Sequence, residues 1–190
     1  MIRMEHVSKC FGEAGLIDGL SLEIGTHGIL AVTGANGSGK TTLLRLLAGL
    51  ETPDSGAVIR PDGCRVSYVF QDLRLVPTLT ALENIELVLD RSRRGEAKRF
   101  LALVGLTEKA DALPGALSGG MRQRIALARA FACGGDILLL DEPFSALDAE
   151  WRQRMADEVK RISETKPVVL VTHDPEDIAQ LGCRVLSLSE

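Results

Sequence analysis

The stretch Gly34-Ala35-Asn36-Gly37-Ser38-Gly39-Lys40-Thr41 has the spacing of a phosphate loop, the motif called Walker A. Its glycines let backbone N–H groups approach the phosphates of a nucleoside triphosphate with no side chain in the way. Lys40 brings a positive charge to the β- and γ-phosphates, and the hydroxyl of Thr41 can bind Mg²⁺. Together with Thr42, the loop is therefore predicted to bind a nucleoside triphosphate.

The residues around the loop provide the setting that such a motif needs. An apolar run from Ile29 to Thr33 predicts a strand before the loop, and Thr41 to Ala48 has the pattern of a helix ended by Gly49. The positive end of that helix would face a bound phosphate. A chance match in a glycine-rich chain is the alternative, and it would not require the strand and the helix.

Length and composition narrow the classes of protein. A chain of 190 residues fits one domain, and its 22 basic and 26 acidic residues give a net charge of −4 with one short basic cluster, Arg91 to Arg94. Nucleic acid is therefore not expected as a partner. No apolar run approaches the roughly 18 residues of a membrane span, and the N-terminus lacks an apolar signal core, so a cytoplasmic location is expected. The four cysteines form no CxxC pair and predict no zinc site.

The pattern of apolar runs predicts an α/β fold in a single domain, residues 1–190. Ile137 to Leu140 and Val168 to Val171 are apolar without alternation, which is typical of parallel strands covered on both faces. Further strands are expected, and they are Ile2 to Val7, Leu20 to Ile24, Ala57 to Arg60, Arg65 to Phe70 and Arg184 to Leu188.

Between residues 72 and 132 the pattern becomes mainly helical. The capping box Thr80-Ala81-Leu82-Glu83 opens a helix towards Leu89, and Glu96 to Val104 predicts a second helix ended by Gly105. The stretch 72–132 is therefore interpreted as an inserted helical subdomain.

Two acids follow the predicted strand Ile137 to Leu140. A buried strand in a parallel sheet would bring Asp141 and Glu142 to the sheet edge at which the phosphates lie. Asp141 would hold Mg²⁺, directly or through water, and Glu142 could polarise the attacking water as general base. A strand that merely ends in two solvated acids is the alternative.

The segment Leu117 to Arg124 opens a strong helical pattern with two glycines, which core packing does not explain. Ser118 fits the N-cap position of that helix. A glycine-flanked helix start with a serine hydroxyl is a second candidate anion site. The alternative is an ordinary N-cap followed by flexible glycines.

Taken in order, these motifs resemble those of the ATP-binding cassette (ABC) ATPases over nearly the whole chain. Leu117 to Met121 resembles the signature motif of that family, with Met121 in place of the usual glutamine. Gln71 resembles the Q-loop glutamine, Ser145 to Asp148 the D-loop, and His173 the switch histidine. Phe11 lies where the family stacks an aromatic ring, more often tyrosine, on adenine.

The resemblance implies a P-loop NTPase core with a mostly parallel sheet, an N-terminal antiparallel β subdomain and the inserted helical subdomain. It implies ATP hydrolysis with Mg²⁺ by two cassettes of identical sequence that meet head to tail. Each ATP would lie between Walker A of one chain and Ser118, Gly119, Gly120 and Asp148 of the other. The implied catalytic residues are Lys40, Gln71, Glu142 and His173, and the implied magnesium ligands are Thr41, Gln71 and Asp141.

The same resemblance implies a transport role, closest to the importers of nitrate, sulfonate and taurine. The partners would be a separate transmembrane permease at the inner face of the cell membrane and a substrate-binding protein. A short permease helix would dock near residues 72–89, where the apolar side chains are Leu73, Leu75, Val76, Leu79 and Leu82. The chain ends 17 residues after His173, which predicts no C-terminal regulatory domain.

Two other functions stay open at this point. A soluble ABC-type ATPase could act on ribosomes, DNA or iron–sulfur assembly, although the second cassette or long coiled coil typical of such proteins is absent from this sequence. A scaffold that binds ATP without hydrolysis is the other, and Glu142 argues against it because a degenerate site would be expected to lose its general base.

Overall fold

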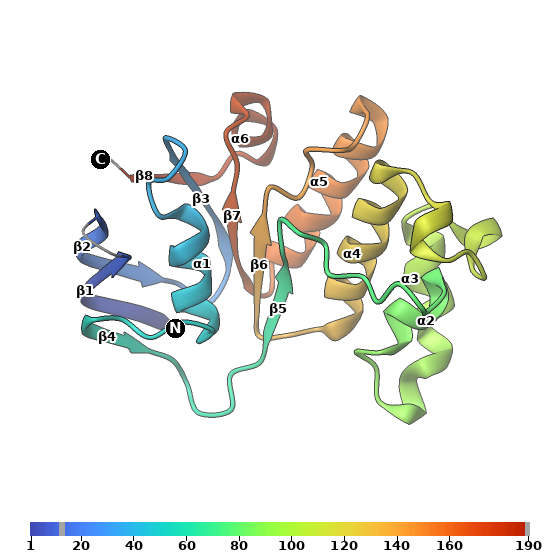
Figure 1. Ribbon diagram of the computed structural model, residues 1–190, viewed down its shortest axis with the longest axis horizontal. Coiled ribbons are helices and arrows are strands. Elements are labelled where there is room, and N and C mark those ends of the chain that lie inside the picture. Colours follow the sequence, from blue (N-terminus) through green and yellow to red (C-terminus); the bar gives the residue numbers. More distant parts are fainter. Residues whose placement is uncertain (12–13, 189–190) are drawn as a thin grey trace.

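The computed structural model describes residues 1–11 and 14–188, and the side chains of residues 11 and 14–16 lie outside the description. The strands form two sheets (Figure 1). One is antiparallel with the order β2 (Ala14–Ile24), β1 (Ile2–Phe11), β4 (Ser55–Ile59). The other is parallel, with the order β5 (Val66–Val69), β6 (Ile137–Asp141), β7 (Pro167–Val171), β3 (Gly28–Gly34), β8 (Arg184–Leu188). The expected α/β fold is confirmed.

The parallel sheet separates two hydrophobic cores, because alternate residues of a strand face opposite sides. In β6, Leu138 and Leu140 face one core, whereas Ile137 and Leu139 face the other. Both faces are therefore apolar, which explains the unbroken apolar runs in β6 and β7.

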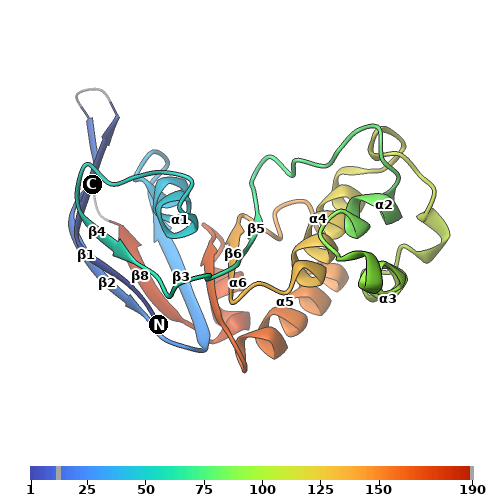
Figure 2. The ribbon, with the colours of Figure 1, turned by 90° about the horizontal axis from the view of Figure 1, so that it is seen from below.

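The α-helices of the described residues are α1 (Lys40–Ala48), α2 (Ala81–Glu86), α3 (Ala97–Leu103), α4 (Gly119–Cys133), α5 (Ala149–Ser163) and α6 (Pro175–Leu181). Of these, α1 packs on one face of the parallel sheet, and α4 and α5 pack on the other. Short 3₁₀ turns connect them, at η1 (Arg91–Glu96), η2 (Thr107–Lys109) and η3 (Pro114–Ala116). Figures 1 and 2 show the antiparallel sheet and α1 at one end of the molecule and α2 and α3 at the other.

The helical end of the molecule is held by local polar contacts. The capping box at Thr80 is present, with Thr80 and Glu83 bonded to each other's backbone N–H groups. The buried side chain of Asn84 bonds to the backbone of Val76, Leu79 and Thr80 and so fixes the loop before α2. α4 packs on α2, on α3 and also on β5, so the limits 72–132 of a helical subdomain stay a prediction.

Several predicted element boundaries were wrong. β1 extends to Phe11 rather than ending at Val7, and β2 begins at Ala14 rather than at Leu20. The two strands pair over almost their whole length, despite register shifts that break the alternation of apolar and polar residues. The helix opened by Thr80 ends at Glu86 rather than near Leu89, and tight turns follow it. The helix expected at Glu96 begins at Ala97, after η1.

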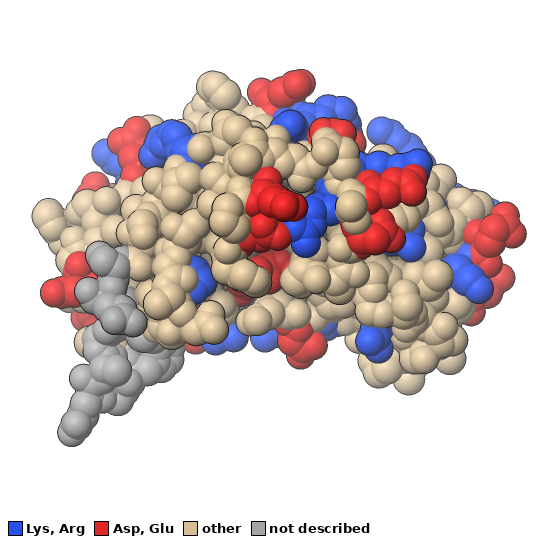
Figure 3. Space-filling view, turned by 90° about the horizontal axis from the view of Figure 1, so that it is seen from above, with Lys and Arg blue, Asp and Glu red and all other residues tan. Residues whose placement is uncertain are grey.

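The length of the described helices and the charge of the surface bear on possible partners. No helix within residues 1–11 and 14–188 is both long enough and apolar enough to cross a membrane. Acidic and basic side chains are mixed on the face seen in Figure 3. The expectation of no nucleic-acid partner stays a prediction.

Candidate nucleotide site

The predicted phosphate-binding, magnesium-binding and catalytic residues gather at one edge of the parallel sheet, where the carboxyl ends of its strands meet. The Walker A loop follows β3, and Gln71 comes two residues after β5. Asp141 ends β6, and His173 comes two residues after β7. Chain segments far apart in the sequence therefore meet because all the strands of this sheet run in the same direction.

The glycines of the Walker A loop adopt backbone conformations that other residues avoid. Gly37 and Gly39 have φ values of 87° and 89°. A Cβ atom on Gly34 would lie 2.6 Å from Ser38 Oγ and 2.6 Å from the carbonyl oxygen of Leu188. The loop is thus closely packed at Gly34, against Ser38 and Leu188. It leads directly into α1, whose first residue is Lys40.

The Lys40 side chain lies over this loop. Its Nζ donates to the carbonyl oxygens of Gly34, at 2.8 Å, and Ala35, at 2.6 Å. The ammonium group and the positive end of the nine-residue helix α1 therefore reinforce each other at the same point. This arrangement attracts an anion with several negative oxygens.

Asp141 lies next to the loop and is 2% exposed. The hydroxyl of Thr41 donates to its Oδ2 at 2.9 Å. Burial raises the pKa of Asp141, while the hydrogen bond from Thr41 lowers it in part. A buried carboxylate beside a hydroxyl and close to the amide of Gln71 is an oxygen-rich donor set that fits Mg²⁺, which prefers a few protein oxygens and keeps several waters.

Glu142 follows Asp141 in a strained backbone conformation, with φ at 50°. A non-glycine residue in this region costs about 1–3 kcal/mol and persists only where its surroundings hold it. Its backbone N–H donates to the carbonyl of Val171 at 3.0 Å. Its Oε1 lies 2.8 Å from His173 Nδ1, and the hydrogen bond and charge of Glu142 raise the pKa of His173.

A cavity of about 380 Å³ brings these groups together, and its lining is Asn36, Gly37, Gly39, Lys40, Thr41, Thr42, Gln71, Asp141, Glu142 and Val171. His173 borders it through its contact with Glu142. The Phe11 side chain, expected to stack on adenine, lies outside the described residues.

The signature motif and the D-loop line a different cavity, of about 200 Å³. Ser118 is the N-cap of α4, as predicted, and its Oγ accepts from the backbone N–H of Met121 at 3.3 Å. Gly120 lies so close to the D-loop that an added Cβ would be 2.7 Å from the carbonyl oxygen of Ala146. Asp148 caps α5 through the N–H of Trp151. One chain therefore does not bring Ser118 to its own Walker A loop.

Gln123 lies on α4, is 4% exposed and is not among the residues predicted for the site from the sequence. Its Nε2 donates to the carbonyl oxygen of Pro143 at 2.7 Å, beside Glu142. A polar residue among the apolar residues of a helix is a signal that could have pointed to it, because buried amides need hydrogen-bond partners.

Comparison with known proteins gives many relatives of one type. The chain is 42% identical over 195 residues to the aliphatic sulfonates import ATP-binding protein SsuB 1 of Burkholderia cenocepacia, an alignment that covers 100% of this chain and 61% of the relative. It is 45% identical over 191 residues to the corresponding SsuB protein of Granulibacter bethesdensis, covering 99% of this chain and 79% of the relative. The chain thus spans about three fifths of the length of the Burkholderia relative.

The fold and a family model agree with these relatives. The dimeric post-hydrolysis structure of the ATP-binding cassette MJ0796 bound to ADP and Pi matches with a TM-score of 0.89 and 30% identity, covering 99% of this chain and 94% of that one. A second dimeric structure of MJ0796 matches with a TM-score of 0.86 and 32% identity, covering 100% and 94%. The family model described as ABC transporter matches residues 17–145. The chain therefore belongs to the ABC transporter family.

Proposed function

We propose that this chain is an ATPase that powers transport through a separate membrane permease. The observation that carries the proposal is the cavity in which Lys40 and the α1 start lie beside Asp141 and Glu142. Anion-binding groups and acids on one sheet edge are the arrangement that phosphoryl transfer from a nucleoside triphosphate needs.

Each group in the cavity has a proposed task. The backbone N–H groups of the loop and Lys40 would bind the β- and γ-phosphates of ATP. Thr41, Gln71 and Asp141 would hold Mg²⁺, which supplies neutralisation of the phosphate charge when bound. Because Asp141 is buried and accepts from Thr41, its carboxylate is already oriented.

Glu142 is the proposed general base, and His173 its positioning partner. The carboxylate of Glu142 would accept a proton from the water that attacks the γ-phosphate. The contact of 2.8 Å with His173 limits the positions that this carboxylate can take. The backbone of Glu142 is in turn held by β7 through Val171.

The two separate cavities support a shared site. Ser118, Gly119 and Gly120 open a 15-residue helix whose start lines a cavity away from Walker A. We propose that this helix start and Asp148 complete the ATP site of a second, identical chain. A γ-phosphate between two helix starts would join the chains, and hydrolysis would remove that contact.

Release of phosphate from ATP by the purified chain tests the proposed activity. We expect phosphate release that depends on added Mg²⁺ and stops when a chelator is added, because the triphosphate charge is then no longer neutralised. Phosphate release no faster than that of a Lys40→Met chain would contradict the proposal.

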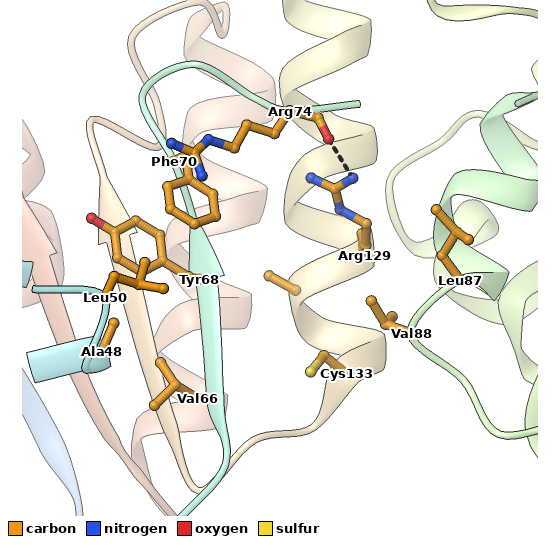
Figure 4. A pocket seen from close by; sticks show the side chains of 11 residues that line it. Ala48, Leu50, Val66, Tyr68, Phe70, Arg74, Leu87, Val88, Arg129 and Cys133 are labelled. Atoms are coloured by element: carbon orange, nitrogen blue, oxygen red, sulfur yellow. Dashed lines mark hydrogen bonds between the residues drawn. The ribbon is translucent and has the colours of Figure 1, made fainter. Parts of the chain in front are cut away.

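A third cavity, apolar and of about 450 Å³, is the proposed docking site for the permease (Figure 4). It lies between the β5 side of the sheet and the helical end, and its lining is Ala48, Leu50, Val66, Tyr68, Phe70, Arg74, Leu87, Val88, Arg129, Ala130 and Cys133. Leu50 and Leu87 are 56% and 53% exposed, which is unusual for two large apolar side chains on one cavity. A short amphipathic helix of the permease would fill such a groove.

The proposed groove shares Arg74, Leu87 and Val88 with the stretch 72–89 that was expected from the sequence to dock the permease, but not the leucines singled out there. Leu73, Leu75 and Leu82 pack against the hydrophobic core rather than lining the groove. The groove remains next to the proposed ATP site, since Phe70 lines it and the following Gln71 lines the phosphate cavity. This continuity supports a route by which permease and nucleotide could affect each other.

Leu87→Asp is expected to weaken binding of the permease at least about a hundredfold, because the apolar contact is lost and a carboxylate would be taken out of water beneath the docked helix. Basal ATP hydrolysis by the isolated chain should not change. Co-purification with the permease is the measurement, and Leu103→Asp, at a leucine 38% exposed outside the groove, is the control. Equal permease recovery with both variants would contradict the docking site.

The names of the relatives support import, and aliphatic sulfonates as the substrate class. Both relatives described above are named as aliphatic sulfonate import proteins. We propose the same substrate class for the transporter that this chain would power, with a substrate-binding protein as a further partner. Through its permease the chain would lie on the inner face of the membrane.

A further inference from the structure

Gln123 connects α4, the helix that begins within the signature motif, to the turn that carries Glu142. It lies on α4 five residues after Ser118, and its side chain is among the buried polar groups of the protein. The Nε2 atom donates to Pro143 O at 2.7 Å and lies 3.4 Å from Glu142 O. A buried amide without such partners would be strongly unfavourable, so the bond fixes the distance between helix and turn.

The turn that receives this bond has a backbone that needs support. Glu142 is a non-glycine residue at φ 50° and precedes Pro143, which further restricts its conformation. The Ser145 hydroxyl donates to the same Glu142 carbonyl at 3.1 Å. Gln123 and Ser145 therefore hold the peptide groups that orient the Glu142 side chain, whereas His173 contacts the carboxylate itself.

We propose that Gln123 is a positioning residue that sets the orientation of Glu142 according to the position of α4. The inference rests on the proposed function, in which Glu142 is the general base and the start of α4 contacts ATP of the second chain. A helix transmits a shift of its first turn along its axis, and Gln123 lies one turn beyond that start. Binding of the partner's ATP would thereby orient the base of the chain's own site.

A change of orientation at a general base has a large effect on rate, because a misplacement of about 1 Å costs about a hundredfold. Loss of the Gln123 amide should therefore lower kcat while the phosphate-binding groups, and with them KM for ATP, stay unchanged. If Gln123 served only in packing, its loss would lower the melting temperature without lowering kcat at an unchanged KM.

The test uses Gln123→Met and Gln123→Ala in the full chain, with Ile125→Val as the control. Gln123→Met keeps the volume of the side chain and Gln123→Ala does not, but both substitutions remove the amide group that donates the hydrogen bond. Ile125 is buried on the same helix, and its truncation lowers stability without removing a hydrogen bond to the Glu142 turn. We expect both Gln123 variants to lose at least about tenfold in kcat, with KM within about twofold of wild type and kcat of Ile125→Val unchanged.

Two further measurements complete the test. Combining Gln123→Met with Ser145→Ala should lower kcat less than the product of the single effects, because both bonds act on one turn. With Glu142→Gln added, Gln123→Met should still form an ATP-dependent dimer. If kcat falls in step with melting temperature across Gln123→Met, Gln123→Ala and Ile125→Val, the inference is overturned. Wild-type chain without ATPase activity would instead overturn the proposed function and the inference together.

Discussion

Replacement of Glu142 by glutamine is expected to lower the rate of ATP hydrolysis at least about a hundredfold. An amide cannot accept the proton of the attacking water, and a general base contributes about 10²–10⁴-fold. ATP should still bind, because Lys40 and the loop that hold the phosphates are unchanged. The removal of a negative charge beside the γ-phosphate should also let an ATP-bound dimer accumulate. Phosphate release and the molecular mass in solution, with and without ATP, measure both effects.

Glu150→Gln is the matched control for this variant. It makes the same chemical change at an exposed acid in the first turn of α5, where Glu150 forms an ion pair with the exposed Arg154. Exposed ion pairs contribute little, so this chain should behave like wild type. A Glu142→Gln chain that hydrolyses ATP at the control rate would remove Glu142 from the role of base.

Replacement of Lys40 by methionine should weaken ATP binding and nearly abolish hydrolysis. A hydrogen bond to a charged group contributes about 1.5–3 kcal/mol, which corresponds to an affinity loss of about ten- to hundredfold. A further loss of about 10²–10³-fold in rate is expected, because the charge also stabilises the transition state. Titration with a fluorescent ATP analogue and phosphate release separate the two losses.

Lys109→Met controls for the loss of one positive charge, since Lys109 is exposed and lies outside both cavities. Its affinity and rate should equal those of wild type. Nucleotide affinity of Lys40→Met that matches the Lys109→Met value would place ATP elsewhere on the molecule.

The central features of the fold could be predicted because they depend on local sequence. The unbroken apolar runs in β6 and β7 predict buried parallel strands, and the Walker A spacing places a loop after one strand. Parallel strands then force Asp141 and Glu142 to the same edge as that loop. The N-cap at Ser118 and the capping box at Thr80 could be predicted because they also depend on local sequence: each involves residues three positions apart.

Features that depend on contacts across the chain could not be predicted. The lengths of β1 and β2 follow from their mutual pairing, which overrides the broken alternation in each strand. The groove combines side chains from the end of α1, from β5 and from the segment after α2, and no short sequence window contains them. The bond of Gln123 to Pro143 spans 20 residues and depends on how α4 packs.

The central claim, an ATP site completed by Ser118 of a second chain, is tested most directly by mixing two defective chains. Lys40→Met removes the Walker A charge, and Ser118→Arg blocks the signature helix start; both also carry Glu142→Gln to retain ATP. Neither chain alone can form an intact shared site, but a mixed dimer has one. The account predicts that ATP-retaining dimers form only in the mixture, with one ATP per two chains. A mixture that retains no more ATP than the separate chains would contradict it.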